Sequence, residues 1–144
     1  MSPITVSKIT SEEDLSRCVN IRSKVFIEEQ NVAIEEEIDG LDGAADHYLL
    51  TLDNHAIGTA RVRYLNDVAK VERVAILKSK RGFNMGRRLM DYIRDDIKKN
   101  PAIGLIKLGA QIQVIAFYEK LGFTCQGDEF LDAGIRHRWM SLTL

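Results

Sequence analysis

Hydrophobic and polar residues alternate over residues 3–8, which is typical of a strand that is buried on one face. The next stretch changes to a helical spacing, and Thr10 followed by Glu13 has the spacing of a capping box. The apolar positions that recur at helical intervals are Leu15, Cys18, Val19, Val25 and Phe26. We therefore predict a helix that begins after Thr10 and ends near Glu29 or Gln30.

The remaining pattern predicts six more strands and two longer helices. The strands are expected at residues 47–52, 56–64, 68–77, 105–109, 123–126 and 135–142, and the helices at residues 86–99 and 115–121. Residues 31–46 form a long irregular loop with one helical turn near residues 35–38. This order of elements indicates a mixed α/β sheet. Because no repeat or boundary interrupts the pattern, we expect a single domain over residues 1–144.

The composition excludes several classes of protein. With 45% hydrophobic and 28% charged residues, the 144-residue chain resembles an ordinary globular domain, and its net charge of −1 argues against broad nucleic-acid binding. No apolar run approaches the roughly 18 residues of a membrane span, and the first residues do not resemble a signal peptide. The two cysteines form neither a disulfide framework nor a zinc pattern. We expect a cytoplasmic protein with no metal and no membrane or nucleic-acid partner.

Charge is unevenly distributed along the chain. Residues 28–46 contain eight acids and no base, whereas residues 78–99 contain eight bases and three acids. Two solvated faces would explain this pattern, and so would one site for a cation and another for an anion. Arg22 lies on the apolar face of the first helix. Since a guanidinium cannot lose its charge, we predict that Arg22 is at least half buried and bonded to an acid or to backbone carbonyls.

A basic loop at residues 81–86 lies between a predicted strand and a predicted helix. Free N–H groups at the start of a helix bind anions, and glycine or asparagine can turn successive N–H groups inward. Arg87 and Arg88 oppose the helix dipole, which favours an anion nearby. The glycine spacing matches neither a Walker A loop nor a dinucleotide fingerprint. A phosphate site and a plain basic connector are the two interpretations.

Several motifs together resemble the GCN5-related N-acetyltransferase (GNAT) superfamily. The acetyl-CoA motif is matched by Val74, Ala75 and Ile76, then Arg81, Gly82 and Gly86, and the C-terminal motif by residues 117–123. Residues 22–30, 39–42, 108–111 and 132–137 resemble the small ElaA-like or YjcF-like branch. The resemblance covers nearly the whole chain. It implies a mixed, mostly antiparallel sheet of about six to seven strands, with three to four helices and splayed fourth and fifth strands.

The resemblance also implies where acetyl-CoA, the acetyl donor, would bind. The backbone of Val74, Ala75 and Ile76 would pair with the pantetheine arm, and residues 82–87 would hold the pyrophosphate. The cofactor-binding residues implied at and beside this loop are Arg81, Gly82, Phe83, Asn84, Met85, Gly86 and Arg87, with Gln111 and Tyr118 further along the chain. Asn84 replaces the family's middle glycine, but asparagine tolerates the left-handed conformation. Gln111 stands where many members have asparagine at the end of the fifth strand.

Catalysis needs a neutral amine and a proton for the departing thiolate. Tyr118 matches the family's tyrosine that bonds the CoA sulfur and acts as general acid, although a core tyrosine is the plain alternative. Glu72 is our candidate for the base, with a paired or solvated glutamate as its alternative. His47, Glu28 and Glu29 are further candidates, each acting directly or through water.

We therefore expect an N-acetyltransferase that moves the acetyl group of acetyl-CoA to a primary amine of a small molecule or peptide. The acidic segment at residues 28–46 would attract the protonated amine. The main alternative is a non-catalytic, acyl-CoA-binding regulatory module of the same fold. The sequence leaves the oligomeric state open, with a homodimer among the possibilities.

Overall fold

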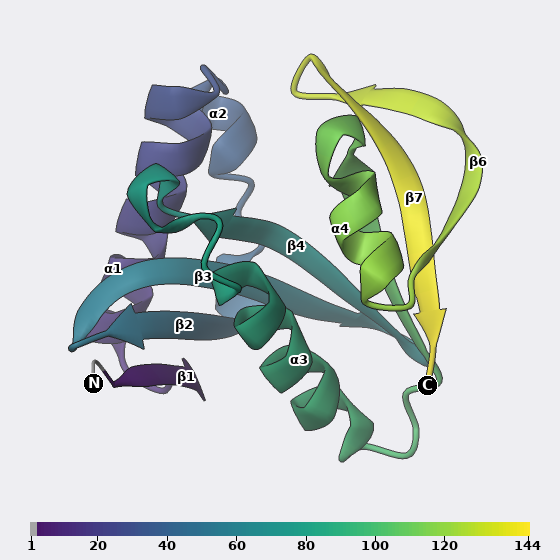
Figure 1. Cartoon of the computed structure of the whole chain (residues 1–144), viewed down its shortest axis with the longest axis horizontal. Coiled ribbons are helices and arrows are strands. Elements are labelled where there is room, and N and C mark those ends of the chain that lie inside the picture. The colour runs from purple at the N-terminus through teal and green to yellow at the C-terminus, as the bar shows by residue number, and fades with distance from the viewer. Residues whose placement is uncertain (1–2) are drawn as a thin grey trace.

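The computed structural model describes residues 3–144 as seven strands and four α-helices joined by turns (Figure 1). The strands are β1 (Ile4–Lys8), β2 (Asp46–Leu52), β3 (His55–Leu65), β4 (Val68–Ile76), β5 (Leu105–Gln111), β6 (Thr124–Asp132) and β7 (Ile135–Thr143). The helices are α1 (Glu12–Arg22), α2 (Ile34–Glu37), α3 (Met85–Lys98) and α4 (Ile115–Lys120). The order of these elements is the predicted one.

Some predicted boundaries are wrong. The cap of α1 is Ser11 rather than Thr10, because the Ser11 side chain accepts the hydrogen bond from the Asp14 N–H at 3.1 Å. The helix then continues as a π-helical segment, η1 (Ser23–Glu29). Strand β6 is much longer than predicted, since its pairing with β7 resumes beyond a bulge after Gln126. The sequence pattern in this bulged region is not a clean alternation, so the extension could not be seen from it.

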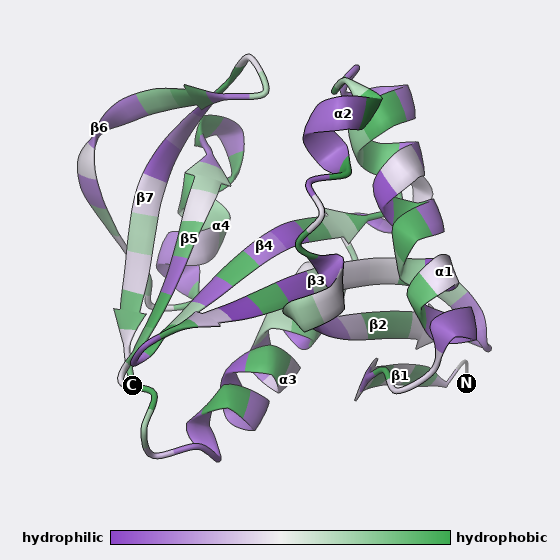
Figure 2. Ribbon diagram, turned by 180° about the vertical axis from the view of Figure 1, so that it is seen from behind, coloured by the Kyte–Doolittle hydropathy of each residue, from purple (hydrophilic) through white to green (hydrophobic). Residues whose placement is uncertain are grey.

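The strands form one sheet in the order β1-β2-β3-β4-β5-β7-β6. Within residues 3–144, neighbouring strands are antiparallel everywhere except between β4 and β5. The predicted mixed, mostly antiparallel sheet is therefore confirmed. Helix α3 covers one face and α1 covers the other, as the two opposite views show (Figures 1 and 2).

Strand β2 shows how both faces are buried. Leu50 belongs to the hydrophobic cluster that contains Leu89 of α3, whereas its neighbour Leu49 packs in the cluster with Cys18 of α1. Successive side chains of a strand point to opposite faces, so each face of β2 meets a different helix. The two hydrophobic clusters pack against opposite faces of the central strands. The strands in turn position the residues at their ends.

Strands β4 and β5 diverge after a very short parallel pairing (Figure 2). They pair only from Val68 with Leu105 to Lys70 with Lys107. Beyond this point β4 also carries a bulge, because its register with β3 gains one residue between Glu72 and Ala75. Arg73 lies in the bulge with a φ of 55°, which is unusual for a residue with a side chain. The predicted splay of the fourth and fifth strands is thus present, with an irregular backbone beside it.

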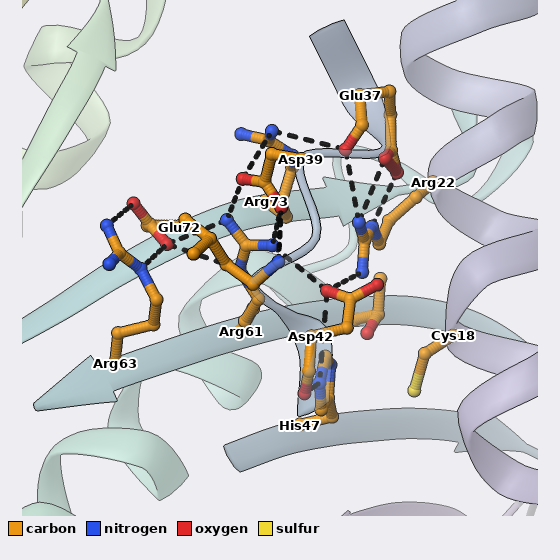
Figure 3. A network of polar contacts seen from close by, with 12 residues as sticks. Cys18, Arg22, Glu37, Asp39, Asp42, His47, Arg61, Arg63, Glu72 and Arg73 are labelled. Carbon is orange, nitrogen blue, oxygen red and sulfur yellow. Dashed lines mark hydrogen bonds and ion pairs between the residues drawn. The ribbon is translucent and has the colours of Figure 1, made fainter. Parts of the chain in front are cut away.

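Buried arginines join the long loop after α1 to the sheet (Figure 3). Arg22 is 1% exposed, and its Nε and Nη2 atoms donate to the two carboxylate oxygens of Glu37 at 2.6 and 2.9 Å. Its Nη1 donates to Asp42 at 2.9 Å. The prediction for Arg22 is confirmed, and the ion pairs hold α2 against α1.

Arg61 makes a second centre in what we call the arginine–carboxylate network, which consists of Arg22, Arg61, Arg63, Lys70, Arg73, Glu37, Asp39, Asp42 and Glu72. The side chain of Arg61 is fully buried on β3. It donates to both oxygens of Asp39 at 2.8 and 2.7 Å, to Asp42 at 2.9 Å and to Glu72 at 2.8 Å. The network therefore ties the loop to β3 and β4 by charge.

Removing one charge from this network should be costly. Arg22→Leu leaves the carboxylate of Glu37 buried without its main partner, so we expect a loss of about 3–5 kcal/mol in the free energy of unfolding. Urea unfolding at neutral pH measures this loss. Arg94→Leu is the control, because its pairs on α3 are exposed and its loss should stay within about 0.5 kcal/mol. Equal stability of the two variants would contradict the structural role of Arg22.

The network should also make stability depend on pH. Burial alone would raise the pKa of Glu72, but hydrogen bonds from Arg63 and Lys70 and the charge of Arg61 lower it to about 2. A carboxylate whose pKa is lower in the folded state stabilises the fold above its usual pKa of 4.5 and loses this effect as the pH falls towards 2. We therefore expect the free energy of unfolding to fall from pH 4.5 towards pH 2, less steeply in Glu72→Gln. Urea unfolding at several pH values measures this dependence. If the free energy of unfolding falls equally steeply with pH in the wild type and in Glu72→Gln, the expectation is contradicted.

Candidate active site

The gap between the splayed strands holds a cavity of about 650 Å³. It extends from the loop before α3, past the edge of β4 and α4, to the hairpin of β6 and β7. The predicted cofactor residues that line it are Val74, Ala75, Ile76, Arg81, Gly82, Asn84, Met85, Gly86, Arg87, Gln111 and Tyr118. Phe83, the remaining predicted cofactor residue, does not line the cavity, and its side chain is 66% exposed.

One edge of β4 faces this cavity. On its other edge, Ile76 and Ala75 pair with Gly58 and Thr59 of β3. Towards β5, the ladder among the described residues ends at Lys70, so the backbone groups of residues 74–76 on that side have no strand partner. Such an edge can accept an extended ligand by strand-like hydrogen bonds.

The N-terminus of α3 opens into the same cavity. Arg88 makes the first backbone bond of the helix, to the Asn84 carbonyl at 3.0 Å, so the N–H groups of residues 85–87 precede the helical ladder. Gly82 has a φ of 86° and Asn84 has a φ of 61°. The left-handed conformation expected at Asn84 is confirmed. These turns leave the N–H groups and the positive end of the helix dipole available to an anion.

Gly86 allows α3 and α4 to approach closely. A Cβ atom at this position would lie 3.1 Å from the Cζ atom of Phe117 on α4. A larger side chain would therefore push against an aromatic ring that also lines the cavity. The requirement for glycine here comes from packing as well as from access to the backbone.

Arg81 joins the end of β4 to η1 across one side of the cavity. Its Nε donates to the Ile76 carbonyl at 2.9 Å, and its two terminal nitrogens donate to the carboxylate of Glu29 at 2.7 Å each. Hydrogen bonding by Arg81 lowers the pKa of Glu29. Glu29, a candidate base from the sequence, is thus held as the partner of a cation.

Tyr118 lies on α4 where the cavity meets the hydrophobic core. Its ring makes edge contacts with Phe117 and Phe123, with centroids 5.0 and 5.7 Å apart. The residue is 6% exposed, and burial raises the pKa of its phenol above the usual 10. The phenol therefore keeps its proton at neutral pH and can donate it to a group inside the cavity.

Glu72 also lines the cavity, but its surroundings do not suit the base predicted from the sequence. It bonds to Arg61, Arg63 and Lys70 at 2.7–3.0 Å. With a pKa of about 2, it binds protons too weakly to take one from an amine efficiently. Glu72 is a structural partner of three cations, and we do not assign it a proton-transfer role.

The acidic segment is only partly available as a negative surface. Arg22 and Arg61 pair with Glu37, Asp39 and Asp42, whereas Glu28, Glu35 and Glu36 are exposed, and Glu36 lines the cavity. Part of the acidic segment is thus explained by buried pairing, which the charge pattern did not predict, whereas most bases of residues 78–99 are exposed, as expected of a solvated face.

The other two candidate bases, His47 and Glu28, do not line the cavity. His47 is buried, and its Nε2 donates to the Asp42 carbonyl at 2.9 Å. It does not line the cavity, and neither does the exposed Glu28. Neither side chain is placed for chemistry at the splayed strands.

The structure adds two features that sequence reasoning missed. Gln30 and Gln111 exchange side-chain hydrogen bonds of 3.4 and 2.9 Å, which link η1 to β5 beside the cavity. At the far end, Phe130, His137 and Trp139 form an aromatic wall. The glutamine pair joins residues 81 positions apart. Phe130 lies in the part of β6 that the sequence pattern did not predict, so no local signal pointed to the wall.

Neither a metal-binding cluster nor a membrane-spanning helix is found among the described residues. Residues 3–144 contain no group of three or more metal-binding side chains. No helix in this same range is long and apolar enough to cross a membrane.

Comparison with known proteins gives consistent matches. The family described as acetyltransferase (GNAT) domain matches residues 8–144. YjcF of Bacillus subtilis, named as an uncharacterised N-acetyltransferase, is 37% identical over 131 residues, which cover 90% of this chain and 93% of YjcF. The crystal structure of Escherichia coli ElaA has a TM-score of 0.84 at 24% identity, covering 98% of this chain and 99% of ElaA.

A larger protein contains the same fold in part. The N-acetylglutamate synthase of Neisseria gonorrhoeae, solved with coenzyme A and N-acetylglutamate, has a TM-score of 0.74 at 15% identity, and the match covers 100% of this chain and 36% of the synthase. The family match and the relatives together confirm the resemblance drawn from the loop and helix motifs. The chain belongs to the GNAT acetyltransferase family, as an acyltransferase enzyme similar to YjcF and ElaA.

Proposed function

We propose that this enzyme transfers the acetyl group of acetyl-CoA to a primary amine of a small molecule or peptide. The observation that carries the proposal is that the free edge of β4 and the N-terminus of α3 open into one cavity. The first suits an extended chain with amide groups, and the second suits a pyrophosphate. Acetyl-CoA contains both, joined in this order.

Each part of the donor has a matching group on this chain. The backbone of Val74, Ala75 and Ile76 would hold the pantetheine arm, and the N–H groups of residues 82–87 would hold the pyrophosphate. Open space surrounds Gly82, where a Cβ atom would meet nothing within 4 Å. Because Arg81 bonds the Ile76 carbonyl, its side chain would have to release this carbonyl if the pantetheine binds there.

Tyr118 would supply the proton that the departing thiolate needs. It lines the cavity, and its raised pKa keeps the phenol protonated until the thiolate forms. As the amine nitrogen bonds the acetyl carbon and the carbon–sulfur bond breaks, the phenol O–H donates to the sulfur. A strand N–H near Val74 would stabilise the negative charge on the carbonyl oxygen.

In this proposal, residues 1–144 form one acetyltransferase domain. The match to the family over residues 8–144 and the single sheet support this view. We place the enzyme in the cytoplasm, where free thiols such as those of Cys18 and Cys125 persist. The acceptor class rests on the family and on the cavity beyond Tyr118, since Glu37, Asp39 and Asp42 of the acidic segment are paired with arginines.

Gly86→Val tests the binding site for the donor. The added side chain would press on Phe117 and displace the N–H groups at the start of α3, so we expect calorimetry to detect no binding of acetyl-CoA. Gly104→Val is the matched control, because a Cβ atom there meets nothing within 4 Å, and its affinity should stay unchanged. Both variants are first checked for cooperative thermal unfolding. An unchanged affinity in folded Gly86→Val would place the donor elsewhere.

Tyr118→Phe tests the proton donor. The change keeps the ring contacts with Phe117 and Phe123 and removes only the hydroxyl, so kcat should fall about 10²–10⁴-fold while the affinity for acetyl-CoA changes little. Thiol release with a panel of primary amines measures kcat, and calorimetry measures affinity. Tyr92→Phe, at a partly exposed tyrosine of α3, is the control and should keep full activity. Full kcat in Tyr118→Phe would return Tyr118 to the role of a core residue.

A further inference from the structure

The three histidines of the chain lie in different environments. His55 is exposed at the start of β3, and His47 is buried, with its Nδ1 unpartnered and its Nε2 bonded to a carbonyl. His137 is 9% exposed on β7, and it is the histidine that lines the cavity shared with Tyr118. The cavity is therefore lined by one imidazole and one phenol, two kinds of side chain that can exchange protons.

The hydrogen bond of His137 determines which ring nitrogen carries a proton. Its Nδ1 lies 2.7 Å from the backbone oxygen of Ile135. Because a carbonyl oxygen can only accept a hydrogen bond, Nδ1 must be the protonated nitrogen. In the neutral ring, Nε2 then holds the lone pair, and it is the nitrogen left for a group in the cavity.

Aromatic packing fixes the orientation of the His137 ring. The ring stacks on Phe130 with centroids 5.6 Å apart and planes inclined by 21°. Phe130 stacks in turn on Trp139 at 4.9 Å and 24°. Gly109 on β5 leaves room for the stack, since a Cβ atom there would lie 3.3 Å from Phe130. A ring that is stacked and hydrogen-bonded in this way is preorganised for one direction of proton transfer.

We propose that Nε2 of His137 is the general base that receives the proton of the acceptor amine. This inference rests on the acetyltransferase function proposed above. As the amine nitrogen bonds the acetyl carbon, its proton passes to Nε2, directly or through one water. The carbon–sulfur bond breaks, and the sulfur takes the proton of Tyr118. Proton exchange with water then restores His137 and Tyr118, so that atoms and charges balance over the cycle.

Other ionisable groups also line this end of the cavity, and two of them, Glu36 and Asp132, are exposed carboxylates without a side-chain ion pair among the described residues. Those on the surrounding elements are Lys107 on β5, Asp132 on β6, Lys70, Glu72 and Arg73 on β4, and Glu36 on α2. Lys107 lies over the ring of Trp139, and Lys70 and Arg73 pair with carboxylates of the network. Imidazole is the side chain that takes up and releases protons near neutral pH, which suits a base for a primary amine.

His137→Asn separates the chemistry from the packing. The asparagine amide N–H₂ can replace Nδ1 as donor to the Ile135 carbonyl, but the variant has no group at the position of Nε2. The assay measures thiol release from acetyl-CoA with 2-phenylethylamine, lysine and an alanine-initiated peptide as acceptors. His55→Asn, at the exposed histidine of β3, is the matched control.

The pH profile is the decisive measurement. In the wild type, kcat/KM should fall on the acidic side as the base becomes protonated, and His137→Asn should lose this dependence together with about 10²–10⁴-fold of its rate. Acetyl-CoA affinity should stay within a factor of two, and added imidazole should restore part of the activity of His137→Ala. A folded His137→Asn with the rate and pH profile of the wild type would overturn the proposal.

The experiment also distinguishes this inference from the proposed function. If the wild type binds acetyl-CoA but releases no thiol with any of the three amines, the transferase function fails and the role of His137 fails with it. If the wild type is active and Tyr118→Phe is impaired while His137→Asn is not, only the assignment of the base is wrong.

Discussion

The short parallel contact between β4 and β5 is the constraint on which the rest of the molecule depends. Three residue pairs make the backbone pairing between the two halves of the sheet, and beyond Lys70 the strands diverge. Unpaired backbone is costly in a dry interior, so the gap must stay accessible to solvent or to a ligand that bonds like a strand. The helices α3 and α4 close the gap on one side and place a helix N-terminus and a phenol within it. The binding site is thus a consequence of where the pairing stops.

The arginine–carboxylate network serves the opposite side of the gap. The loop that contains α2 has few apolar contacts of its own, since Ile34 and Ile38 are more than half exposed. Charge holds it instead, through Arg22 on α1 and Arg61 on β3, both almost fully buried (Figure 3). Buried ion pairs are stable only when every partner is present, so the loop is held in one arrangement rather than many. The wall of the cavity formed by this region is therefore built with little hydrophobic packing.

Local patterns predicted most of the fold, and the motifs of the family predicted residues that line the cavity. Features that depend on pairing between distant segments were not predicted. The order of elements followed from periodicity, and the left-handed Asn84 and the buried Arg22 followed from the chemistry of single residues. The environment of Glu72 could not be predicted in this way, because its cationic partners come from β3 as well as β4. The pKa of Glu72 depends on all of these partners. The aromatic wall was missed for a similar reason: Phe130 meets His137 only because β6 resumes its pairing beyond a bulge.

The two halves of the molecule also divide its ionisable groups by task. Three carboxylates near the splayed strands, Glu72, Asp39 and Asp42, are bound to arginines or lysines, which lowers their pKa values and makes them weak bases. A reaction that moves protons in the same cavity then needs groups outside the network, and neutral side chains avoid the cost of isolated buried charges. The two groups proposed above for this chemistry, the buried phenol of Tyr118 on α4 and the stacked imidazole of His137 on β7, lie in the half of the sheet that the network does not reach. In this arrangement the ion pairs that stabilise the fold and the groups proposed for proton transfer are different residues of one cavity.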